Sequence, residues 1–482
     1  MLFNSLEFLL FFPLVTFLFY VIPHKYRWML LLLASCYFYM YFKPVYILIL
    51  LFTIIIDYFA GIYIERAKSQ KQRKLLLVLS IISNIGILVF FKYFNFLSFN
   101  LQQIFNSLSI DQRLPILDIL LPIGLSFHTF QAISYTIEVY RGNQKSEKHF
   151  GIYALYVMFY PQLVAGPIER PQNVLHQFHE RKYFKSDNFI LGARWMLLGF
   201  LKKVVIADNV SIASDYVFNN VSNQSMLTLI VGGLFFTVQI YADFSGYSDI
   251  ALGSAKVMGF DLMKNFNNPY FSVSIKDFWT RWHISLSTWF RDYVYVPLGG
   301  NRVSKLRNYL NVFIVFVLSG FWHGASWNFI VWGAMHGALV TFENMFNISS
   351  KVNGKNLVVV ISKWGANFSV IILTWMAFRI TDISDLIAAY KIIFNGIVHL
   401  FQWDYGISLD LSGLRDFNIN QVKLLLFAVL LFFLFEVLRN HKTILQVFYN
   451  SSVLRRLSYT FAILIIFFFG YLNKVQFIYF QF

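Results

Sequence analysis

The stretch from Asn268 to Leu339 combines aromatic and ionisable residues in an otherwise apolar chain. Residues 268–300 read NPYFSVSIKDFWTRWHISLSTWFRDYVYVPLGG, and residues 310–339 read LNVFIVFVLSGFWHGASWNFIVWGAMHGAL. An ionisable side chain at the centre of a membrane costs about 2.5–3.5 kcal/mol even on the mildest scale, and such residues are retained mainly where they line a site. The stretch therefore indicates a functional site built into apolar helices.

The composition of the whole chain is that of a membrane protein. Of its 482 residues, 57% are hydrophobic and 13% are charged, whereas about 25% are charged in a soluble domain. Long apolar runs recur along the chain, so we expect an all-α polytopic fold. The first run lacks a basic segment before it and contains Glu7, so we expect it to be retained rather than cleaved as a signal peptide. The single cysteine, Cys36, excludes a disulfide within the chain.

The net charge of +16 comes from Lys and Arg residues that cluster in short loops between the apolar runs. This placement follows the positive-inside rule and argues against nucleic-acid binding. Counted against these loops, the runs predict about twelve spans with both chain ends outside. The runs are 8–22, 28–42, 45–64, 75–96, 117–139, 189–207, 226–256, 309–326, 328–346, 364–379, 422–438 and 458–480.

A further run, 150–168, has basic loops on both sides and contains Pro161 and Pro167. A re-entrant or buried segment explains this better than a span, and an ordinary kinked span is the alternative. Residues 380–420 form an acidic stretch that we place outside. We divide the chain into N-terminal transmembrane helices (1–116), a catalytic core (117–346) and C-terminal transmembrane helices (347–482).

The basic segment 264–300 carries aromatic residues near helical spacing, namely Trp279, Trp282, Trp289 and Phe290. One interpretation is an amphipathic helix that lies in the membrane interface. The other is a cytoplasmic entrance that binds the phosphates of a donor such as acyl-CoA, because Arg and Lys suit phosphate groups. In that case the donor-binding residues are Lys276, Arg281, Arg291 and Trp282. Spacing alone leaves both interpretations open.

The simplest candidate for chemistry is His323, which stands between Trp322 and the small residues 324–326. A neutral imidazole can accept a proton from a hydroxyl near neutral pH, as a general base must. If the helix continues past His323, Trp327 shares its face. The alternative is a hydrogen-bonded core histidine with no catalytic role.

A second histidine, His336, cannot stack on His323 along one straight helix, because neighbours on a helix face are three or four residues apart. It can face the same cavity from the next helix, as a second catalytic group, as a group that tunes His323, or as a packing residue. The sequence leaves these three roles open. No acidic pair or His/Cys cluster with zinc spacing accompanies the two histidines, so we expect no metal.

Two further groups of polar residues lie within apolar runs. Asp243 and Asp249 have the placement expected of a polar cavity or a cation path. His128, Gln131 and Tyr135 step by three and four residues and so share one helical face. Such a stripe is typical of contacts that hold helices together.

Four motifs carry a resemblance: YPQLVAGPIERP at 160–171, YADFSGYSDIALG at 241–253, FWTRWHISLSTWFRDYVYVPLGG at 278–300 and SGFWHGASWNFIVWGAMHG at 319–337. They resemble the membrane-bound O-acyltransferase (MBOAT) family, and most of all its bacterial alginate O-acetylation branch. The resemblance implies that His323 is the family's active-site histidine and His336 its second recurrent histidine. It also implies a bundle of about 11–12 transmembrane helices, with re-entrant and amphipathic cytoplasmic helices around a central funnel.

The function implied by the resemblance is O-acetylation across the bacterial cytoplasmic membrane. Acetyl-CoA would be a cytoplasmic donor substrate rather than a resident cofactor, and the final acceptor would be an alginate-like polysaccharide outside. The family usually works with periplasmic or extracellular acetyltransferase partner proteins. Within the family, the alternatives are O-acetylation of peptidoglycan or cellulose and D-alanylation of teichoic acid.

Two rival classes of function remain. A transporter of a lipid-linked sugar would also have broken helices and buried Asp and His residues, which suit proton-coupled export. A structural role as the membrane platform of a secretion complex is the third possibility. Neither rival would consume a thioester donor.

Overall fold

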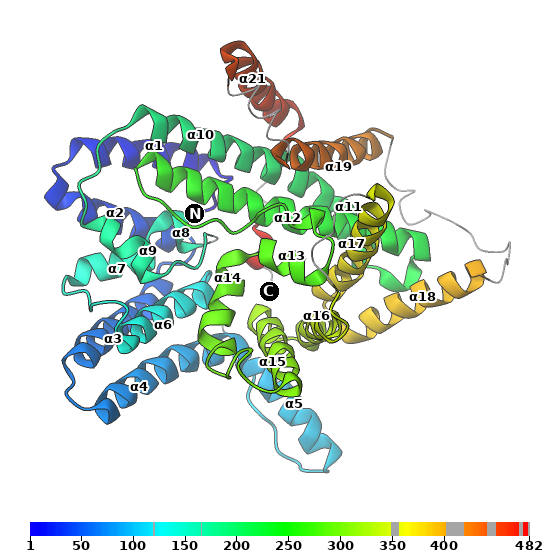
Figure 1. Cartoon of the computed structure of the whole chain (residues 1–482), viewed down its shortest axis with the longest axis horizontal. Helices are drawn as coiled ribbons and strands as arrows, with labels where there is room; N and C mark the ends of the chain where they lie inside the picture. The colour runs from blue at the N-terminus through cyan, green and yellow to red at the C-terminus, as the bar shows by residue number, and fades with distance from the viewer. Residues whose placement is uncertain are drawn as a thin grey trace. The chain divides into compact units, whose positions relative to one another are not determined.

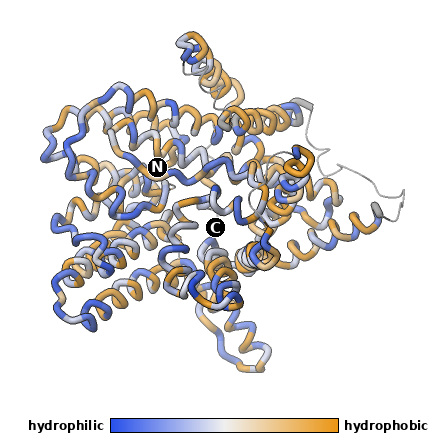
Figure 2. The backbone as a smooth tube through the Cα atoms, viewed as in Figure 1, coloured by the Kyte–Doolittle hydropathy of each residue, from blue (hydrophilic) through white to orange (hydrophobic). Residues whose placement is uncertain are grey.

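The computed structural model describes residues 1–118, 121–164, 166–348, 356–401, 419–440, 450–471 and 476–480. Throughout these residues the chain forms helices and connecting segments, and none of them is in a β-strand (Figure 1). Hydrophobic residues are concentrated along the helices and hydrophilic residues at many of their ends and connections (Figure 2). A helix pairs its backbone groups within one segment, which is what a lipid environment requires. The all-α fold expected from the sequence is therefore confirmed.

Five helical segments in the described part of the chain are long and apolar enough to cross a membrane. They are Tyr46–Arg66, Gln70–Ser107, Met226–Val257, Leu357–Arg379 and Ser452–Phe469. A span needs about 20 mainly apolar residues, because each residue of a helix advances about 1.5 Å. The chain is thus a multi-pass membrane protein, while the count of about twelve spans, their orientation and the three-part division stay predictions.

The structure divides into two compact units. The first consists mainly of Met1–Met196 and Ser248–Lys264, and the second of Leu197–Tyr247 and Asn265–Gln481. Helices of the first unit are α1 (Leu6–Val21), α2 (His24–Met40), α3 (Tyr46–Arg66), α4 (Gln70–Leu88), α5 (Phe94–Ser107), α6 (Leu125–Arg141), α7 (Phe150–Met158), α8 (Tyr160–Leu163), α9 (Pro171–Val174) and most of α10 (Ser186–Phe200).

The proline-containing run 150–168 forms a buried, broken segment rather than a span. Its main helix, α7, has nine residues, which advance about 14 Å and cover half of a bilayer core of about 30 Å. Phe159 interrupts the helix with φ −51° and ψ 110°, and the short helix α8 follows. The residues of α7 from Gly151 onward are buried. The sequence-based prediction of a re-entrant or buried segment agrees with this geometry.

Polar side chains of α6 hold neighbouring parts of the first unit together. The Gln131 side-chain amide donates to the Tyr156 carbonyl oxygen at 2.6 Å, and the Tyr135 hydroxyl accepts from the Glu147 amide at 2.9 Å. His128 is buried and its ring lies 6.0 Å from that of Tyr39. The stripe predicted from the sequence therefore consists of contacts within the helix bundle.

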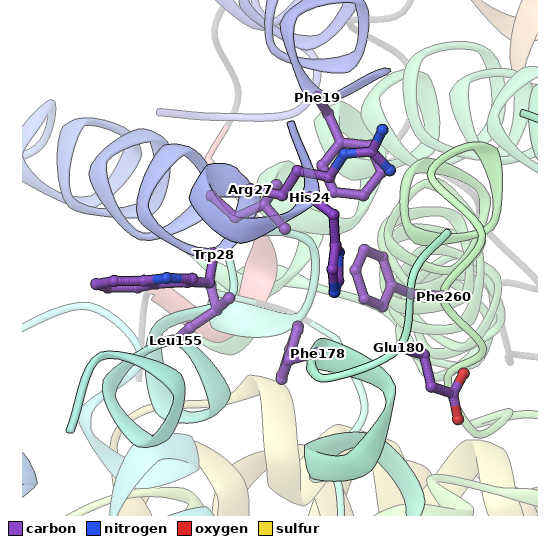
Figure 3. Close-up of a pocket in the computed structure, with 9 residues that line it drawn as sticks. Phe19, His24, Arg27, Trp28, Leu155, Phe178, Glu180 and Phe260 are labelled. Carbon is purple, nitrogen blue, oxygen red and sulfur yellow. The ribbon is translucent and has the colours of Figure 1, made fainter. Parts of the chain in front are cut away.

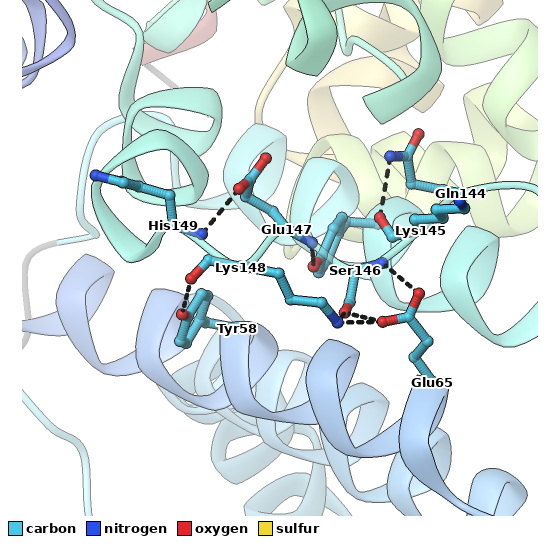
Figure 4. A network of polar contacts seen from close by, with 9 residues as sticks. Tyr58, Glu65, Gln144, Lys145, Ser146, Glu147, Lys148 and His149 are labelled. Carbon is cyan, nitrogen blue, oxygen red and sulfur yellow. Dashed lines mark hydrogen bonds and ion pairs between the residues drawn. The ribbon is translucent and has the colours of Figure 1, made fainter. Parts of the chain in front are cut away.

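The basic connector after α6 is fastened to α3 by a polar network (Figure 4). The Glu65 carboxylate accepts from the Ser146 hydroxyl at 2.5 Å and is paired with the Lys148 ammonium group. The Tyr58 hydroxyl donates to the Lys148 carbonyl oxygen at 2.6 Å. These bonds fix a loop whose positive charges were used to predict its side of the membrane.

A buried carboxylate, Asp57, joins α3 to α4. The Ser80 hydroxyl donates to it at 2.6 Å, and the Asn84 amide donates to both carboxylate oxygens at 3.0 and 2.9 Å. All three side chains are almost completely buried. Buried polar groups are stable when their hydrogen bonds are made in this way.

The first unit also contains a small pocket between α2, α7 and the connector that precedes α10 (Figure 3). It is lined by Phe19, His24, Arg27, Trp28, Leu31, Leu155, Phe178, Glu180 and Phe260. None of the sequence-predicted catalytic or donor-binding residues lines it. Those predicted residues belong to the second unit.

The second unit contains the motifs that the sequence singled out. After a π-helical turn, Leu201–Ala207, its helices are α11 (Asp208–Phe218), α12 (Met226–Val257), α13 (Ile275–Arg281), α14 (Ile284–Phe290), α15 (Lys305–His323), α16 (Trp327–Met345), α17 (Leu357–Arg379), α18 (Ile383–Phe401), α19 (Ile419–Asn440) and α21 (Ser452–Phe469). The end of α12 belongs to the first unit.

The structure adds one helix to the C-terminal third and corrects one predicted run. The acidic stretch 380–420 contains a 19-residue helix, α18, which the sequence did not predict, while its residues 402–418 lie outside the described ones. The predicted run 458–480 ends early, because α21 stops at Phe469 before Gly470, whose backbone is extended. A turn of 3₁₀ helix, Ile478–Phe480, follows separately. Hydropathy alone did not distinguish these last apolar residues from a span.

Candidate active site

Helices α15 and α16 form a tight hairpin around the histidine motif. The chain leaves α15 at His323, and the Ser326 hydroxyl caps the start of α16 by accepting from the Asn328 amide at 3.3 Å. Small residues let the two helices approach closely, because a Cβ on Gly320 would stand 2.2 Å from the Phe329 carbonyl oxygen. A Cβ on Gly333 would likewise stand 2.4 Å from the Phe316 carbonyl oxygen. The glycines of the motif thus serve helix packing.

The condition under which Trp327 would share a helical face with His323 is not met. The helix ends at His323, where Gly324 has φ −163° and ψ 154°, and Trp327 begins the next helix. Trp327 is exposed, whereas His323 is 4% exposed. The small residues between them provide a turn rather than a continuous helix.

Aromatic rings surround the His323 imidazole. Its centroid lies 5.2 Å from that of Trp332 and 5.2 Å from that of Phe378, both nearly perpendicular to it. The Trp322 and Tyr479 centroids lie at 4.9 and 5.6 Å. The imidazole is therefore held in a low-dielectric environment in which interactions with developing charge are strong.

His336 lies on the next helix, as one of the sequence-based alternatives required. Its Nδ1 accepts a hydrogen bond from the Trp279 indole at 3.2 Å, which leaves the proton of a neutral ring on Nε2. Its ring centroid is 5.0 Å from that of Trp332, which also contacts His323. The two histidines thus share Trp332 as a neighbour, and the catalytic role of each stays a prediction.

Three residues near this group were not singled out from the sequence. Tyr479 packs on His323 from the end of the chain, and its centroid also lies 6.4 Å from that of His283. His283 is fully buried in a left-handed backbone conformation with φ 41°. Trp332 is 0% exposed, and its indole N–H makes no hydrogen bond within the described residues. His283 stands within a motif quoted above, but nothing in the sequence pattern marks Tyr479.

The predicted donor-binding cations lie on α13 and on the π-helical turn Arg291–Tyr295 that follows α14. The Arg281 guanidinium pairs with Asp277 at 2.8 Å, and that of Arg291 with Asp292 at 2.8 Å. The ammonium group of Lys276 donates to the side chain of Asn344 at 3.1 Å. No recorded contact joins the three cations to one another in the described part of the chain, so their role as a phosphate site stays a prediction.

The single amphipathic helix proposed for the aromatic residues of 264–300 was wrong. His283 breaks the segment into α13 and α14, and Trp282, Trp289 and Phe290 are buried inside the protein. Trp282 is 1% exposed and packs 4.9 Å from Trp375 and 5.1 Å from Phe266, centroid to centroid. These rings form part of the core around the histidines instead of a face turned to lipid.

The two acidic residues of α12 have different surroundings. Asp243 pairs with the Lys203 ammonium group at 2.9 Å, and Asp208 pairs with the same group at 2.8 Å. Asp249 is partly exposed. The charge beside Asp243 is thus the Lys203 ammonium group, and the polar cavity or cation path stays a prediction. Within the described residues, no group of three or more His, Cys, Asp or Glu side chains has a metal-binding arrangement.

Comparison with known proteins places this hairpin in a family context. The family model described as "MBOAT, membrane-bound O-acyltransferase family" matches residues 149–381, which include both histidines. The chain is 38% identical over 397 residues to the probable alginate O-acetylase AlgI of Pseudomonas aeruginosa, and the match covers 82% of this chain and 75% of that protein. The chain belongs to the membrane-bound O-acyltransferase family. It is thus an O-acyltransferase, as the motifs predicted.

Other relatives act on different polymers, according to their names. The peptidoglycan O-acetyltransferase of Helicobacter pylori is 34% identical over 425 residues, covering 81% of this chain and 79% of the relative. The teichoic acid D-alanyltransferase of Bacillus subtilis is 29% identical over 263 residues, covering 52% of this chain and 65% of the relative. Members of one MBOAT group thus have different acyl groups and acceptors in their names.

Proposed function

We propose that this O-acyltransferase moves an acetyl group from cytoplasmic acetyl-CoA across the bacterial cytoplasmic membrane, for O-acetylation of an alginate-like polysaccharide outside. The observation that carries the proposal is the buried aromatic cage around His323, in a motif that lies within the matched MBOAT region. The alginate O-acetylase relative supports the acetyl group and the polysaccharide. A periplasmic or extracellular partner protein would complete transfer to the polymer.

His323 is the proposed general base. Its neutral imidazole takes the proton of an acceptor hydroxyl as the oxygen attacks the thioester carbonyl, which forms a C–O bond and a tetrahedral oxyanion. Collapse of this intermediate breaks the C–S bond, and the CoA thiolate takes the proton back from the imidazolium. Positioned base catalysis contributes about 10²–10⁴-fold, so orientation and charge stabilisation must supply the rest of the acceleration.

Trp332 is the proposed donor to the oxyanion. Its indole N–H is buried without a hydrogen-bond partner in the described residues, while its ring touches His323. A buried donor without a partner costs about 1–3 kcal/mol, a cost that an incoming oxyanion would offset. The His336 ring contacts the Trp332 ring, and His336 Nδ1 accepts a hydrogen bond from the Trp279 indole. The proposed role of His336 is to position the Trp332 indole.

Donor and acceptor must both reach a ring that is 4% exposed. The proposal therefore requires movement of at least one covering ring, and Tyr479 and Phe378 are the covering rings carried by other segments. Lys276, Arg281 and Arg291 are proposed to bind the CoA phosphates, with Trp282 supporting α13 from the core. The Arg291 side chain is exposed and can exchange its Asp292 partner for phosphate at little cost, because ion pairs near the surface are weak.

Purified protein in detergent, given acetyl-CoA labelled in the acetyl group, tests the proposal against transport. We expect release of CoA thiol and labelled product or acetate from the wild type, and none above background from a folded His323→Ala variant. A lipid-linked sugar transporter would bind its substrate but leave acetyl-CoA intact. Equal thioester consumption by wild type and variant would contradict the role of His323.

The identity of the polymer needs a separate experiment. Cells that lack the gene should lose O-acetyl groups from one envelope or secreted polysaccharide, measured after mild alkaline release of acetate. Loss from peptidoglycan or cellulose, or loss of D-alanine from teichoic acid, would select one of the family alternatives over the alginate-like acceptor. Retention of all these groups with loss of a secretion complex would favour the structural platform.

A further inference from the structure

The last described segment of the chain, 476–480, lies within the aromatic core of the second unit. Phe477 is 0% exposed, and its ring lies 4.5 Å from Tyr247 and 5.6 Å from Phe244. The Tyr479 ring lies 4.7 Å from Phe244 and 5.6 Å from His323, centroid to centroid. Two rings of one short segment thus contact α12 and the candidate base.

A buried carboxylate holds the backbone of this segment. The Ile478 amide donates to Asp243 Oδ2 at 2.9 Å, while Asp243 Oδ1 stands 2.9 Å from the Lys203 ammonium group. Lys203 is fully buried and its second partner is Asp208, at 2.8 Å. A hydrogen bond to an ionised acceptor contributes more than a neutral one, so this contact is a strong point of attachment.

The π-helical turn Leu201–Ala207 and the start of α11 hold the chain directly after α21. A π-helical turn leaves carbonyl groups available to other donors, and such turns are frequent at functional sites. The Val204 carbonyl oxygen accepts from the Tyr471 amide at 2.8 Å. The Asn209 side chain, one turn later, donates to the Phe469 carbonyl oxygen at 2.9 Å. The chain that leaves α21 is therefore bonded to the same helical stretch that carries Lys203.

We propose that Asp243 is a positioning residue of the catalytic centre, acting through the backbone of Ile478 to hold Tyr479 against His323. The inference rests on the proposed function of His323 and adds a structural requirement to it. The Lys203 ammonium group orients the Asp243 carboxylate, and the segment 476–480 transmits the position of this carboxylate to the centre. Asp243 itself makes no recorded contact with His323.

The plain alternative is an ion cluster that only stabilises the fold. Removing one partner of a buried ion pair is strongly destabilising whichever carboxylate is lost. Asp208 is a matched control, because it is equally buried and shares the Lys203 ammonium group, yet no bond from Asp208 to the segment 476–480 is recorded. A role confined to stability affects Asp208→Asn and Asp243→Asn alike, whereas a positioning role separates them.

The first measurement is steady-state transfer from labelled acetyl-CoA by the full-length protein in detergent. We expect Asp243→Asn to lower kcat by at least about tenfold, as loss of a charge-assisted hydrogen bond allows, with KM for acetyl-CoA within about twofold of the wild type. Asp208→Asn should keep kcat within about threefold of the wild type, even if its unfolding temperature falls as much as that of Asp243→Asn. Equal loss of kcat in the two variants would overturn the proposal.

The second measurement does not depend on activity. Hydrogen exchange followed by mass spectrometry should find the Ile478 amide protected in the wild type and in Asp208→Asn, and exchanging in Asp243→Asn. Protection that is unchanged in Asp243→Asn would overturn the proposal whatever the kinetics. If instead His323→Ala keeps full activity, the proposed function fails, whereas an inactive His323→Ala beside an active Asp243→Asn refutes only the present inference.

Discussion

The cluster of Asp57, Ser80 and Asn84 on α3 and α4 and the two histidines of the α15–α16 hairpin are all buried, but their neighbours differ. Asp57 accepts three hydrogen bonds from Ser80 and Asn84. His323 is surrounded by aromatic rings, and the neighbouring Trp332 keeps an indole N–H without a partner in the described residues. A carboxylate that accepts hydrogen bonds on both oxygens serves stability. A buried N–H donor without an acceptor is costly and indicates a site for a ligand or a reacting group.

The largest expected effect is the loss of activity on substitution of His323. His323→Ala should lower kcat by about 10²–10⁴-fold, the usual contribution of a positioned general base. The variant should remain folded in detergent, so that the loss of activity exceeds any loss of structure. Transfer from labelled acetyl-CoA and thermal unfolding in detergent check both statements. If the variant is inactive only because it is unfolded, His323 has a structural role like that of Asp57.

The next effect concerns the oxyanion. Trp332→Phe keeps an aromatic ring next to His323 but removes the N–H, so kcat should fall by about 10²–10³-fold, as for loss of one oxyanion donor. KM for acetyl-CoA should change little, since the bond forms mainly in the transition state. Trp375→Phe is a control, because Trp375 stacks on Trp332 without contacting His323 in the described structure. Similar losses in both variants would assign Trp332 to packing.

The third prediction tests the hydrogen bonds that Asp57 accepts from Ser80 and Asn84. Asp57→Ala removes the acceptor of three buried hydrogen bonds, while the Ser80 hydroxyl can still donate to Thr136 and the Asn84 amide to the Ser80 carbonyl oxygen. We therefore expect a loss of about 1–3 kcal/mol in total. We expect a clear fall of the unfolding temperature, with kcat per folded molecule unchanged. Asp57→Asn should lose less stability, because one oxygen still accepts. A folded Asp57→Ala variant with impaired catalysis would remove the distinction between the two regions.

The smallest expected effect concerns the carboxyl of Glu169, which lies in the connector before α9. Burial raises its pKa from 4.5 to about 7, against the opposing hydrogen bonds from the Met263 amide and the Asn173 side chain. Because the folded state holds this proton more tightly than the unfolded state, its contribution to stability is full below the unfolded pKa of 4.5 and falls as pH rises to about 7.

Glu169→Gln keeps an uncharged acceptor and should remove that contribution to the pH dependence. Between the two pKa values, the unfolding temperature of the wild type should decline relative to that of the variant. Thermal unfolding across this range checks the difference. Parallel curves for the two proteins would show that Glu169 has the same pKa in the folded and unfolded states.

Several elements of the site could be predicted from the sequence. The long apolar runs gave the helical membrane fold, and the histidine motif located the hairpin and both of its histidines. The break at His283 was missed, because a left-handed backbone at a non-glycine residue has no reliable signal in sequence. The end of the last long helix was missed because apolar residues of a buried segment and of a span have the same composition.

The sequence by itself determined the membrane setting, the family motifs and the glycines that bring α15 and α16 together, since these depend on composition and on neighbours along the chain. Only the tertiary structure decided what surrounds His323. Trp332 comes from the next helix, Phe378 from α17 and Tyr479 from the end of the chain. Ring contacts, buried ion pairs and unused donors arise where distant segments pack together, and such contacts have no local pattern in the sequence.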